Sequence, residues 1–315
     1  MKISVVLASW NGAAYIEKQL RSLAEQTRAP DEVIICDDAS FDDTVEVIRR
    51  FLSERGLSGW RLEENTENLG YIRNFRRAMQ LCTGELIFLC DQDDIWHPDK
   101  IRRMEECFSR YPRIRALASG YRTIDRDDMP VFGVLPLYRR MKRWRKSSLH
   151  RIRGSVFYEN VAQGCACAYR RPVVEEYLST GADCLLPHDW ALNALAFRSR
   201  SLYYLKEELL SYRIHGGNAI GVLRRENTVD SRSQVLREFE QQLSKLEKLP
   251  ASETEKQRDR RYRDFIRYRI ALTEKGGLLR FAGGFLRYPR FLLENSLLSY
   301  CKDYAVSLKK RKTAE

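Results

Sequence analysis

The residues best able to do chemistry are carboxylates that directly follow short apolar runs. Asp91, Asp93 and Asp94 come straight after the run Leu86–Cys90. Like charges this close together destabilise one another unless a cation or hydrogen-bond donors compensate them. Carboxylate oxygens suit Mg²⁺ or Mn²⁺, which such sites commonly share with phosphate oxygens. We interpret Asp91 and Asp93 as metal ligands. The alternative is a solvated acidic turn that caps the next helix, a role that suits Asp94 and Asp99.

A second acidic pair, Asp37 and Asp38, follows the run Val33–Cys36. These carboxylates could contact a ribose or accept a hydrogen bond from a base. Capping of the next helix is the alternative, but residues 40–43 could supply caps without them.

Two later residues are weaker candidates. Asp189 lies between an apolar run and an apolar helix, where burial would raise its pKa toward that of a useful general base; an N-cap role explains it equally well. His215 precedes a Gly-Gly turn and could contact a metal or a diphosphate, whereas a lone histidine is more often structural.

The elements that must position these residues alternate along the first 120 residues. Apolar runs at 3–8, 33–36 and 86–90 predict strands buried on both faces, as in parallel sheets. Helical spacing between them predicts helices near 16–23, 45–52 and 98–110. Ligands bind beyond the carboxyl ends of such strands, so the polar residues there should converge. Further along, we expect a strand at 164–169, a helix after Pro172 and another near Asp189.

Composition bounds the remaining possibilities. The 315 residues carry 55 Lys and Arg against 43 Asp and Glu, a formal charge of +12, which favours an anionic partner: nucleic acid, anionic lipid or phosphorylated small molecules. No apolar run approaches the length of a spanning helix, no export signal is visible, and the eight cysteines are interpreted as reduced and structural. We therefore expect a cytoplasmic protein.

The chain resembles the family-2 glycosyltransferases of the GT-A fold, especially their rhamnosyltransferase-like branch. The resemblance covers roughly residues 1 to 220 and is carried, in the family's order, by Ile3–Gly12, Ile35–Ser40, Asn68–Gly70, Cys90–Trp96 and His188–Trp190. It implies a doubly wound α/β fold with a mainly parallel central sheet flanked by helices, followed by a mostly helical C-terminal extension.

The resemblance also implies roles for single residues. Ser9, Asn11, Asp37 and Asp38 would bind the nucleotide, with Asp38 reading a pyrimidine base. Asp91-Gln92-Asp93 matches the family's DxD signature, in which Asp93 binds the metal and Asp91 the ribose or the metal shell. Asp189 matches the catalytic base, and His215 a histidine that reaches the metal or diphosphate. One departure is His188, which stands where many relatives carry a glutamate.

We therefore predict a metal-dependent, inverting glycosyltransferase that uses Mg²⁺ or Mn²⁺. Its donor would be dTDP-rhamnose or a UDP-sugar, and its acceptor a glycan or lipid-linked oligosaccharide in surface polysaccharide synthesis. The predicted domains are 1–222, with a nucleotide-binding half (about 1–120) and an acceptor half (about 121–222), and a basic helical region at 223–315. Two alternatives are a sugar-phosphate nucleotidyltransferase and a non-catalytic basic module that binds membrane or nucleic acid.

Two basic segments have open interpretations. Residues 139–153 hold eight Lys or Arg and could form a flap over the anionic donor or a solvated surface loop. Residues 277–300 mix Leu and Phe with arginines; they could bind the inner face of the cell membrane, form a homodimer or pack on the catalytic domain, and 309–312 would add attraction to anionic lipid. A nucleic-acid partner is not expected.

Overall fold

The structure is a computed structural model that describes residues 1–131, 148–153, 162–181, 186–215, 228–293 and 297–312; of 309–312 it describes only the backbone. The chain divides into two compact units. The first contains residues 1–152 and 160–222, and the second contains 153–159 and 223–315. The finer division of the first unit into nucleotide-binding and acceptor halves stays a prediction.

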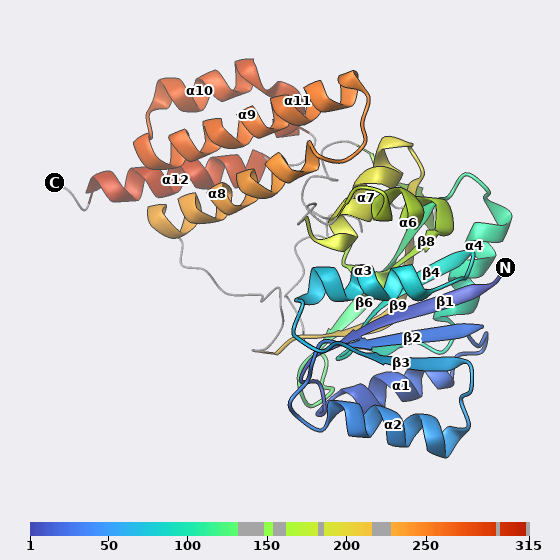
Figure 1. Cartoon of the computed structure of the whole chain (residues 1–315). Helices are drawn as coiled ribbons and strands as arrows, with labels where there is room; N and C mark the ends of the chain where they lie inside the picture. The colour runs from blue at the N-terminus through green and yellow to red at the C-terminus, as the bar shows by residue number, and fades with distance from the viewer. Residues whose placement is uncertain (132–147, 154–161, 182–185, 216–227, 294–296, 313–315) are drawn as a thin grey trace. The chain divides into compact units, whose positions relative to one another are not determined.

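The described residues of the first unit form a nine-stranded sheet (Figure 1). Its order is β3-β2-β1-β4-β8-β6-β9-β5, with β7 paired to β9. The strands are β1 (Ile3–Ser9), β2 (Glu32–Asp37), β3 (Trp60–Glu64), β4 (Leu86–Asp91), β5 (Ile95–Trp96), β6 (Ala116–Ile124), β7 (Leu149–Arg151), β8 (Cys167–Arg170) and β9 (Leu202–Arg213).

The parallel part of the sheet brings the predicted polar strand ends together. β3, β2, β1 and β4 all run parallel. Ser9 pairs in register with Asp37, and Ala8 pairs with Asp91, so the last residues of β1, β2 and β4 lie side by side. The predicted convergence of these strand ends is confirmed.

Helices cover both faces of the sheet (Figure 1). Alternate side chains of β1, β2 and β4 form one buried cluster with α1 (Ile16–Ala24), α2 (Thr44–Arg55) and α4 (Lys100–Arg110). The opposite face carries α3 (Tyr71–Leu81), α6 (Arg171–Leu178) and α7 (His188–Arg198). Because both faces are covered, the central strands read as continuous apolar runs. The predicted α/β fold class is confirmed.

Two local predictions are corrected. The expected strand at 164–169 begins as a 3₁₀ turn, η2 (Gly164–Ala166), and becomes β8 only at Cys167. Within the predicted capping residues 40–43, Asp43 occupies the N-cap position of α2 without a side-chain capping bond, and Asp42 accepts from the N–H of Thr44 at 3.1 Å. Asp94 does not cap α4: it is fully buried and accepts a hydrogen bond from the backbone N–H of Arg213.

The second unit is helical in its described residues, as predicted for the C-terminal region. Its helices are α8 (Val229–Leu246), α9 (Glu253–Lys275), α10 (Leu278–Arg287), α11 (Pro289–Phe291) and α12 (Leu297–Lys312). Tyr262 and Phe265 of α9 are buried against Phe291. Among the helices that the structure describes, none is long and apolar enough to cross a membrane.

Candidate functional site

Ser9 and Asp37 link the ends of β1 and β2. The Ser9 hydroxyl donates to Asp37 Oδ2 at 2.8 Å, and the backbone N–H and hydroxyl of Ser40 donate to the same carboxylate at 2.8 and 2.7 Å. Asp37 is 1% exposed. Asn11, with a left-handed backbone (φ 47°), accepts from the N–H of Phe41 at 3.0 Å. These bonds fix the shape of the two loops.

Asp38 holds the loop that precedes α3. Its carboxylate accepts hydrogen bonds from Asn65 Nδ2 (2.7 Å), from the N–H of Leu69 (2.8 Å) and from the N–H of Gly70 (2.8 Å). A carboxylate offers roughly four acceptor positions, so most of its capacity serves this loop. The Asn68–Gly70 motif therefore has a structural explanation: it supplies amides to a buried aspartate.

Gln92, between the two aspartates of the DxD sequence, ties β4 to β1. Its side chain accepts from the N–H of Trp10 at 2.8 Å and donates to the carbonyl of Trp10 at 2.9 Å. Gly12 leaves room for this contact, because a Cβ there would overlap the Gln92 amide. The indole of Trp10 is 49% exposed and lies edge-on to the exposed ring of Phe41.

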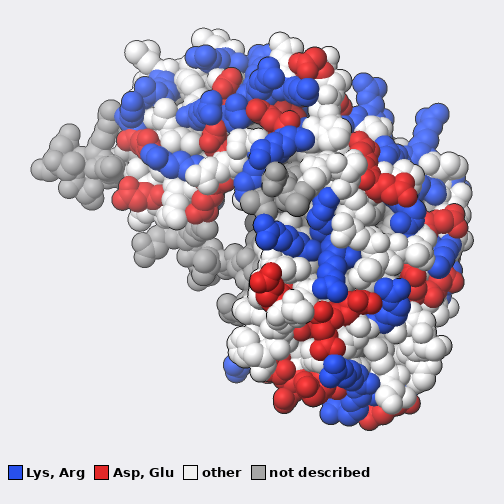
Figure 2. Space-filling model, viewed as in Figure 1, with Lys and Arg blue, Asp and Glu red and all other residues white. Residues whose placement is uncertain are grey.

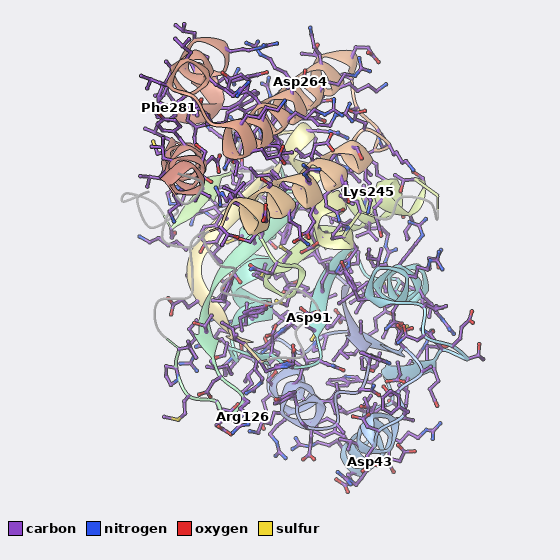
Figure 3. All side chains as sticks on the ribbon, turned by 90° about the vertical axis from the view of Figure 1, so that its left-hand side faces the viewer. Asp43, Asp91, Arg126, Lys245, Asp264 and Phe281 are labelled. Carbon is purple, nitrogen blue, oxygen red and sulfur yellow. The ribbon has the colours of Figure 1, made fainter. Side chains whose placement is uncertain are left out.

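Asp93 and His215 lie together although 122 positions separate them. His215 Nε2 is 2.8 Å from Asp93 Oδ2, and the imidazole stacks on Tyr15 at 5.0 Å. Desolvation, followed by the charges of Asp93 and Asp189, raises the pKa of Asp91 to about 7. Figure 3 shows Asp91 among the strand ends, whereas Asp43 lies apart at the start of α2.

Three of the predicted site residues carry hard ligand atoms. Asp91, Asp93 and His215 offer carboxylate oxygens and an imidazole nitrogen, the donor types that Mn²⁺ accepts, and the structure pairs His215 with Asp93. The neighbouring charge of Asp93 helps to raise the pKa of Asp91, and a bound cation would relieve this repulsion. These donor types fit a divalent metal.

A second group, Asp94, Asp91 and Cys165, also places its ligand atoms within 4.8 Å of one another. Burial raises the pKa of the Cys165 thiol well above its ordinary value. The buried Lys100 ammonium lies 3.8 Å from the Trp96 ring centroid and donates to the Cys165 carbonyl. We interpret Asp94, Cys165 and Lys100 as buried residues that pack beneath Asp91 and hold the end of β4 in place.

Asp189 is the second residue of α7, and it is 6% exposed. It is not the N-cap, which is Pro187. Its Oδ1 accepts from the N–H of Trp190 at 2.7 Å, and its Oδ2 accepts from the N–H of Gly164 at 3.2 Å. The charge of Asp189 also contributes to the raised pKa of Asp91, so the two carboxylates lie close enough to interact electrostatically.

His188 lies in an aromatic pocket beside Asp189. It stacks on Phe75 with ring centroids 4.0 Å apart and meets Tyr71 edge-on at 6.1 Å. Burial lowers the pKa of His188 to about 4, so the ring is neutral near pH 7. Its Nδ1 has no hydrogen-bond partner among the described residues. Tyr71 is 39% exposed, and burial followed by the charge of Asp189 raises its pKa.

Sequence reasoning missed several residues of this site. Arg213 is fully buried, donates to the Asp93 carbonyl at 2.7 Å and pairs with Asp128 at 2.6 Å. Its guanidinium also covers the ring of Tyr15. An arginine two positions before a candidate metal ligand was a usable signal; Tyr15 offered none. Trp10 lies within the noted motif Ile3–Gly12 and Tyr71 directly follows Asn68–Gly70, but the exposure of the two side chains could not be predicted from the sequence.

Most of the predicted flap lies outside the described residues. The structure describes only 148–153 of the basic segment 139–153, and it describes nothing of 216–227, which follow His215.

A parallel α/β sheet whose strand ends present carboxylates at one edge defines the class of nucleotide-binding proteins with the ligand at that edge. The model of glycosyl transferase family 2 matches residues 4–178, more than half of the chain. The chain belongs to glycosyl transferase family 2, so its class is that of the nucleotide-sugar glycosyltransferases. The predicted family and enzyme class are confirmed.

Curated relatives match the same region. A dTDP-rhamnosyl transferase, RfbG of Shigella flexneri, is 26% identical over 226 residues, which cover 68% of this chain and 73% of RfbG. An uncharacterized glycosyltransferase of Nostoc is 26% identical over 226 residues, which cover 69% of this chain and 66% of that protein. The chain thus matches about two thirds of the length of these relatives.

Solved structures share the fold. The structure of residues 1–349 of Staphylococcus aureus TarS in complex with UDP-GlcNAc superposes with a TM-score of 0.61 at 14% identity, covering 100% of this chain and 93% of that one. A mannosyltransferase of Pyrobaculum calidifontis in complex with GDP-Man and Mn²⁺ gives a TM-score of 0.59 at 16% identity, covering 98% and 84%. These likenesses support the GT-A fold alone.

Proposed function

We propose that this chain is a metal-dependent, inverting glycosyltransferase. It moves a sugar from a nucleoside diphosphate, dTDP-rhamnose or a UDP-sugar, onto a hydroxyl of a glycan or lipid-linked acceptor in surface polysaccharide synthesis. The rhamnosyl transferase and the TarS protein, a poly(ribitol-phosphate) β-N-acetylglucosaminyltransferase, support this donor class. We place the protein at the cytoplasmic side of the membrane.

One observation carries the proposal. Asp91, the Asp93–His215 pair and Asp189 come from three distant parts of the chain and meet at one edge of the sheet. Their clustering costs stability through charge repulsion and burial. A site that binds a cation and a diphosphate explains why these carboxylates cluster. A non-catalytic basic module that binds membrane or nucleic acid would not need them.

Asp91, Asp93 and His215 would hold the Mg²⁺ or Mn²⁺. When bound, this ion neutralises charge that develops on the departing diphosphate. The protein's own contribution is orientation: Arg213 fixes the Asp93 carbonyl, and Tyr15 supports the His215 ring.

Asp189 is the proposed base. Its bonds to the amides of Gly164 and Trp190 fix the carboxylate, and a carboxylate oxygen can accept a substrate proton. It takes the proton from the acceptor hydroxyl as that oxygen attacks the anomeric carbon opposite the leaving group. The attack inverts the anomeric configuration and needs no covalent enzyme intermediate.

The nucleobase of the donor would lie between the loops that follow β1 and β2. The exposed indole of Trp10 offers a flat aromatic face, on which a base can stack. We propose that Asp38 orders the 65–70 loop and accepts a hydrogen bond from the nucleobase at its remaining acceptor position. Ser9, Asn11 and Asp37 then act by fixing the backbone around the nucleotide.

Calorimetric titration with UDP and with dTDP, each with and without Mn²⁺, tests the proposal. We expect binding that requires Mn²⁺, and the preferred nucleotide tells whether the donor is a dTDP-sugar or a UDP-sugar. Asp93→Asn should abolish the metal dependence, whereas Asp43→Asn, an exposed carboxylate at the start of α2, should leave it intact. Failure of both nucleotides to bind under every condition would contradict a transferase.

Asp189→Asn separates chemistry from binding. The amide keeps the shape of the side chain but cannot accept the proton, so transfer should fall by at least about 10²-fold. Nucleotide binding should be unchanged in the same titration. Normal transfer by this variant would show that another group is the base.

A further inference from the structure

The second unit carries an unusual concentration of exposed apolar side chains. Of the thirteen large hydrophobic residues that are exposed among those described, eight lie between 278 and 308. They are Leu278, Leu279, Phe285, Leu286, Leu293, Leu297, Leu298 and Leu308. Single exposed leucines need no explanation, but a cluster of this kind marks a surface that binds something.

Helix α10 is turned with its large apolar residues outward. Leu279 is 91% exposed and Leu286 is 88% exposed, and seven positions separate them, so they lie on one side of the helix. Its inner side combines the Phe281 ring with Gly284, which is buried and at which a Cβ would overlap the ring of Tyr300. An ordinary surface helix has the opposite arrangement.

Tyrosine side chains hold α10 in this orientation. The Tyr300 hydroxyl donates to the Phe281 carbonyl at 2.7 Å, and the Tyr268 hydroxyl donates to the Arg280 carbonyl at 2.5 Å. The Phe281 ring stacks on Tyr304 at 4.5 Å. Because these contacts come from both α9 and α12, the outward direction of the leucines is fixed by packing within the unit.

Helix α12 presents a matching face next to α10. Leu297, Leu298, Cys301 and Leu308 are exposed at helical spacing, while Tyr300 and Asp303 are buried. Phe281, Phe285 and Tyr300 contact one another where the two helices meet. Figure 3, in which Phe281 is labelled, shows α10 and α12 side by side. We call the outward side chains of α10 and α12, with Leu293, the apolar face.

Among the described residues from 275 to 308, the charges that reach the surface are positive. Between 275 and 308 the described residues include five bases, Lys275, Arg280, Arg287, Arg290 and Lys302, and a single carboxylate, Asp303. Asp303 is fully buried between Arg232 and Arg269, so it offers no charge to the surface. Four consecutive bases follow at 309–312. Figure 2 shows that Lys and Arg outnumber Asp and Glu on the visible side of this unit.

From this combination we infer that the apolar face of α10 and α12 binds an anionic lipid bilayer. Leucine and phenylalanine side chains enter the interface between headgroups and acyl chains, and the surrounding bases meet lipid phosphates. A second copy of the chain fits less well, because two faces with the same positive charge would repel each other. The inference concerns the second unit and does not depend on the transfer reaction.

Vesicle co-sedimentation of the full-length protein tests this inference. We expect binding to vesicles of 70% phosphatidylcholine and 30% phosphatidylglycerol, weaker binding at 500 mM than at 50 mM salt, and little binding to pure phosphatidylcholine. The double variant L279D/L286D should bind on the order of a hundredfold more weakly, because each leucine loses its burial in the interface. Both residues are exposed, so the variant should fold.

Two further variants complete the experiment. Y111D/M129D adds the same charges at two exposed apolar residues of the first unit and should bind like the wild type. R287Q/K302Q should weaken binding to the anionic vesicles and reduce its salt dependence. Equal binding of L279D/L286D and wild type, or no binding to either vesicle, would overturn the inference. A dimer in analytical ultracentrifugation that L279D/L286D dissociates, without vesicle binding, would assign the face to a second copy instead.

Discussion

Burial shifts the pKa values of four ionisable side chains near the carboxyl end of β4 in the direction that favours their neutral forms. It raises the pKa values of Asp91 and Asp94 and lowers those of Lys100 and His188. Desolvation is the largest cause for each of them, since it disfavours a charge of either sign. Asp94 is fully buried, whereas Asp91 keeps some solvent access. The free site is therefore less charged than its sequence suggests.

His188 gives this effect a measurable consequence. Its pKa is about 4 in the folded protein, against roughly 6.5 in an unfolded chain. Between these values the unfolded state binds more protons, so the free energy of unfolding falls as pH drops from 6.5 toward 4. From pH 7.5 to pH 5 the histidine should account for about 2 kcal/mol of lost stability. Urea unfolding at both pH values measures this loss.

The matched variant is His188→Gln, which cannot titrate in this range. It should lose about 2 kcal/mol less than the wild type over the same pH interval. Other acid-sensitive groups affect both proteins equally and cancel in the comparison. An identical loss in both proteins would mean that His188 is protonated in the folded state.

Helix α7, which carries the proposed base Asp189, packs very closely against the η2 turn at Gly164. The η2 turn passes so near α7 that a Cβ on Gly164 would lie 3.2 Å from His188 Nε2 and 3.3 Å from Asp189 Cβ. Gly164→Ala should push the base away by a few tenths of an ångström. Because misplacement of about 1 Å can cost 10²-fold in rate, we expect about a tenfold loss of kcat.

Steady-state kinetics and nucleotide titration check this expectation together. Gly164→Ala should leave donor binding unchanged, since Gly164 touches the base and not the proposed metal ligands. Gly59→Ala is the matched control: its Cβ would be 3.5 Å from the nearest atom, an ordinary contact. Full activity of Gly164→Ala would indicate that Asp189 tolerates displacement or is not the base.

The elements that the sequence predicted well are those buried on both faces. β1, β2 and β4 are apolar throughout because helices cover them on either side. β3 is an edge strand with a polar sequence, and β9 is long and irregularly paired, so neither has a clear period. Helix α3 did offer a signal: its buried residues Asn74, Phe75, Ala78 and Met79 have helical spacing.

The site was predictable where neighbouring strands end together, and unpredictable where distant segments meet. Adjacent parallel strands require Ser9, Asp37 and Asp91 to share one edge. No local rule indicates that Tyr15 supports the His215 ring or that Arg213 binds the Asp93 carbonyl. These contacts depend on the path of β9, which only the folded chain establishes.

At the scale of the whole molecule, the excess of positive charge belongs mainly to one unit. Residues 223–315 contain 22 Lys and Arg against 13 Asp and Glu, while residues 1–222 contain 33 against 30. The net charge that suggested an anionic partner is therefore concentrated in the helical part. The nearly balanced part contains the acidic strand edge. The proposed metal and donor binding and the inferred attraction to anionic surfaces therefore belong to different stretches of the chain.

Each unit has its own core, so we expect damage to one to leave the other folded. Asp303 of α12 provides the test, because its carboxylate accepts from Arg232 of α8 at 2.7 Å and from Arg269 of α9 at 2.6 Å. Asp303→Asn keeps the side-chain volume but leaves two guanidinium groups without their shared counter-charge. Breaking a buried pair in this way should lower the free energy of unfolding of the helical unit by about 3 kcal/mol.

Urea unfolding followed by circular dichroism measures this loss, and titration with the preferred nucleotide and Mn²⁺ reports on the first unit. Asp264→Asn is the matched control, because Asp264 is an exposed residue of α9 whose pair with Arg267 is 3.9 Å long; it should change stability by less than about 0.5 kcal/mol. Nucleotide affinity should be unchanged in both variants. If Asp303→Asn weakened nucleotide binding as much as it weakened the helices, the two units would share their stability, and the helical unit would have to be counted as part of the transferase site.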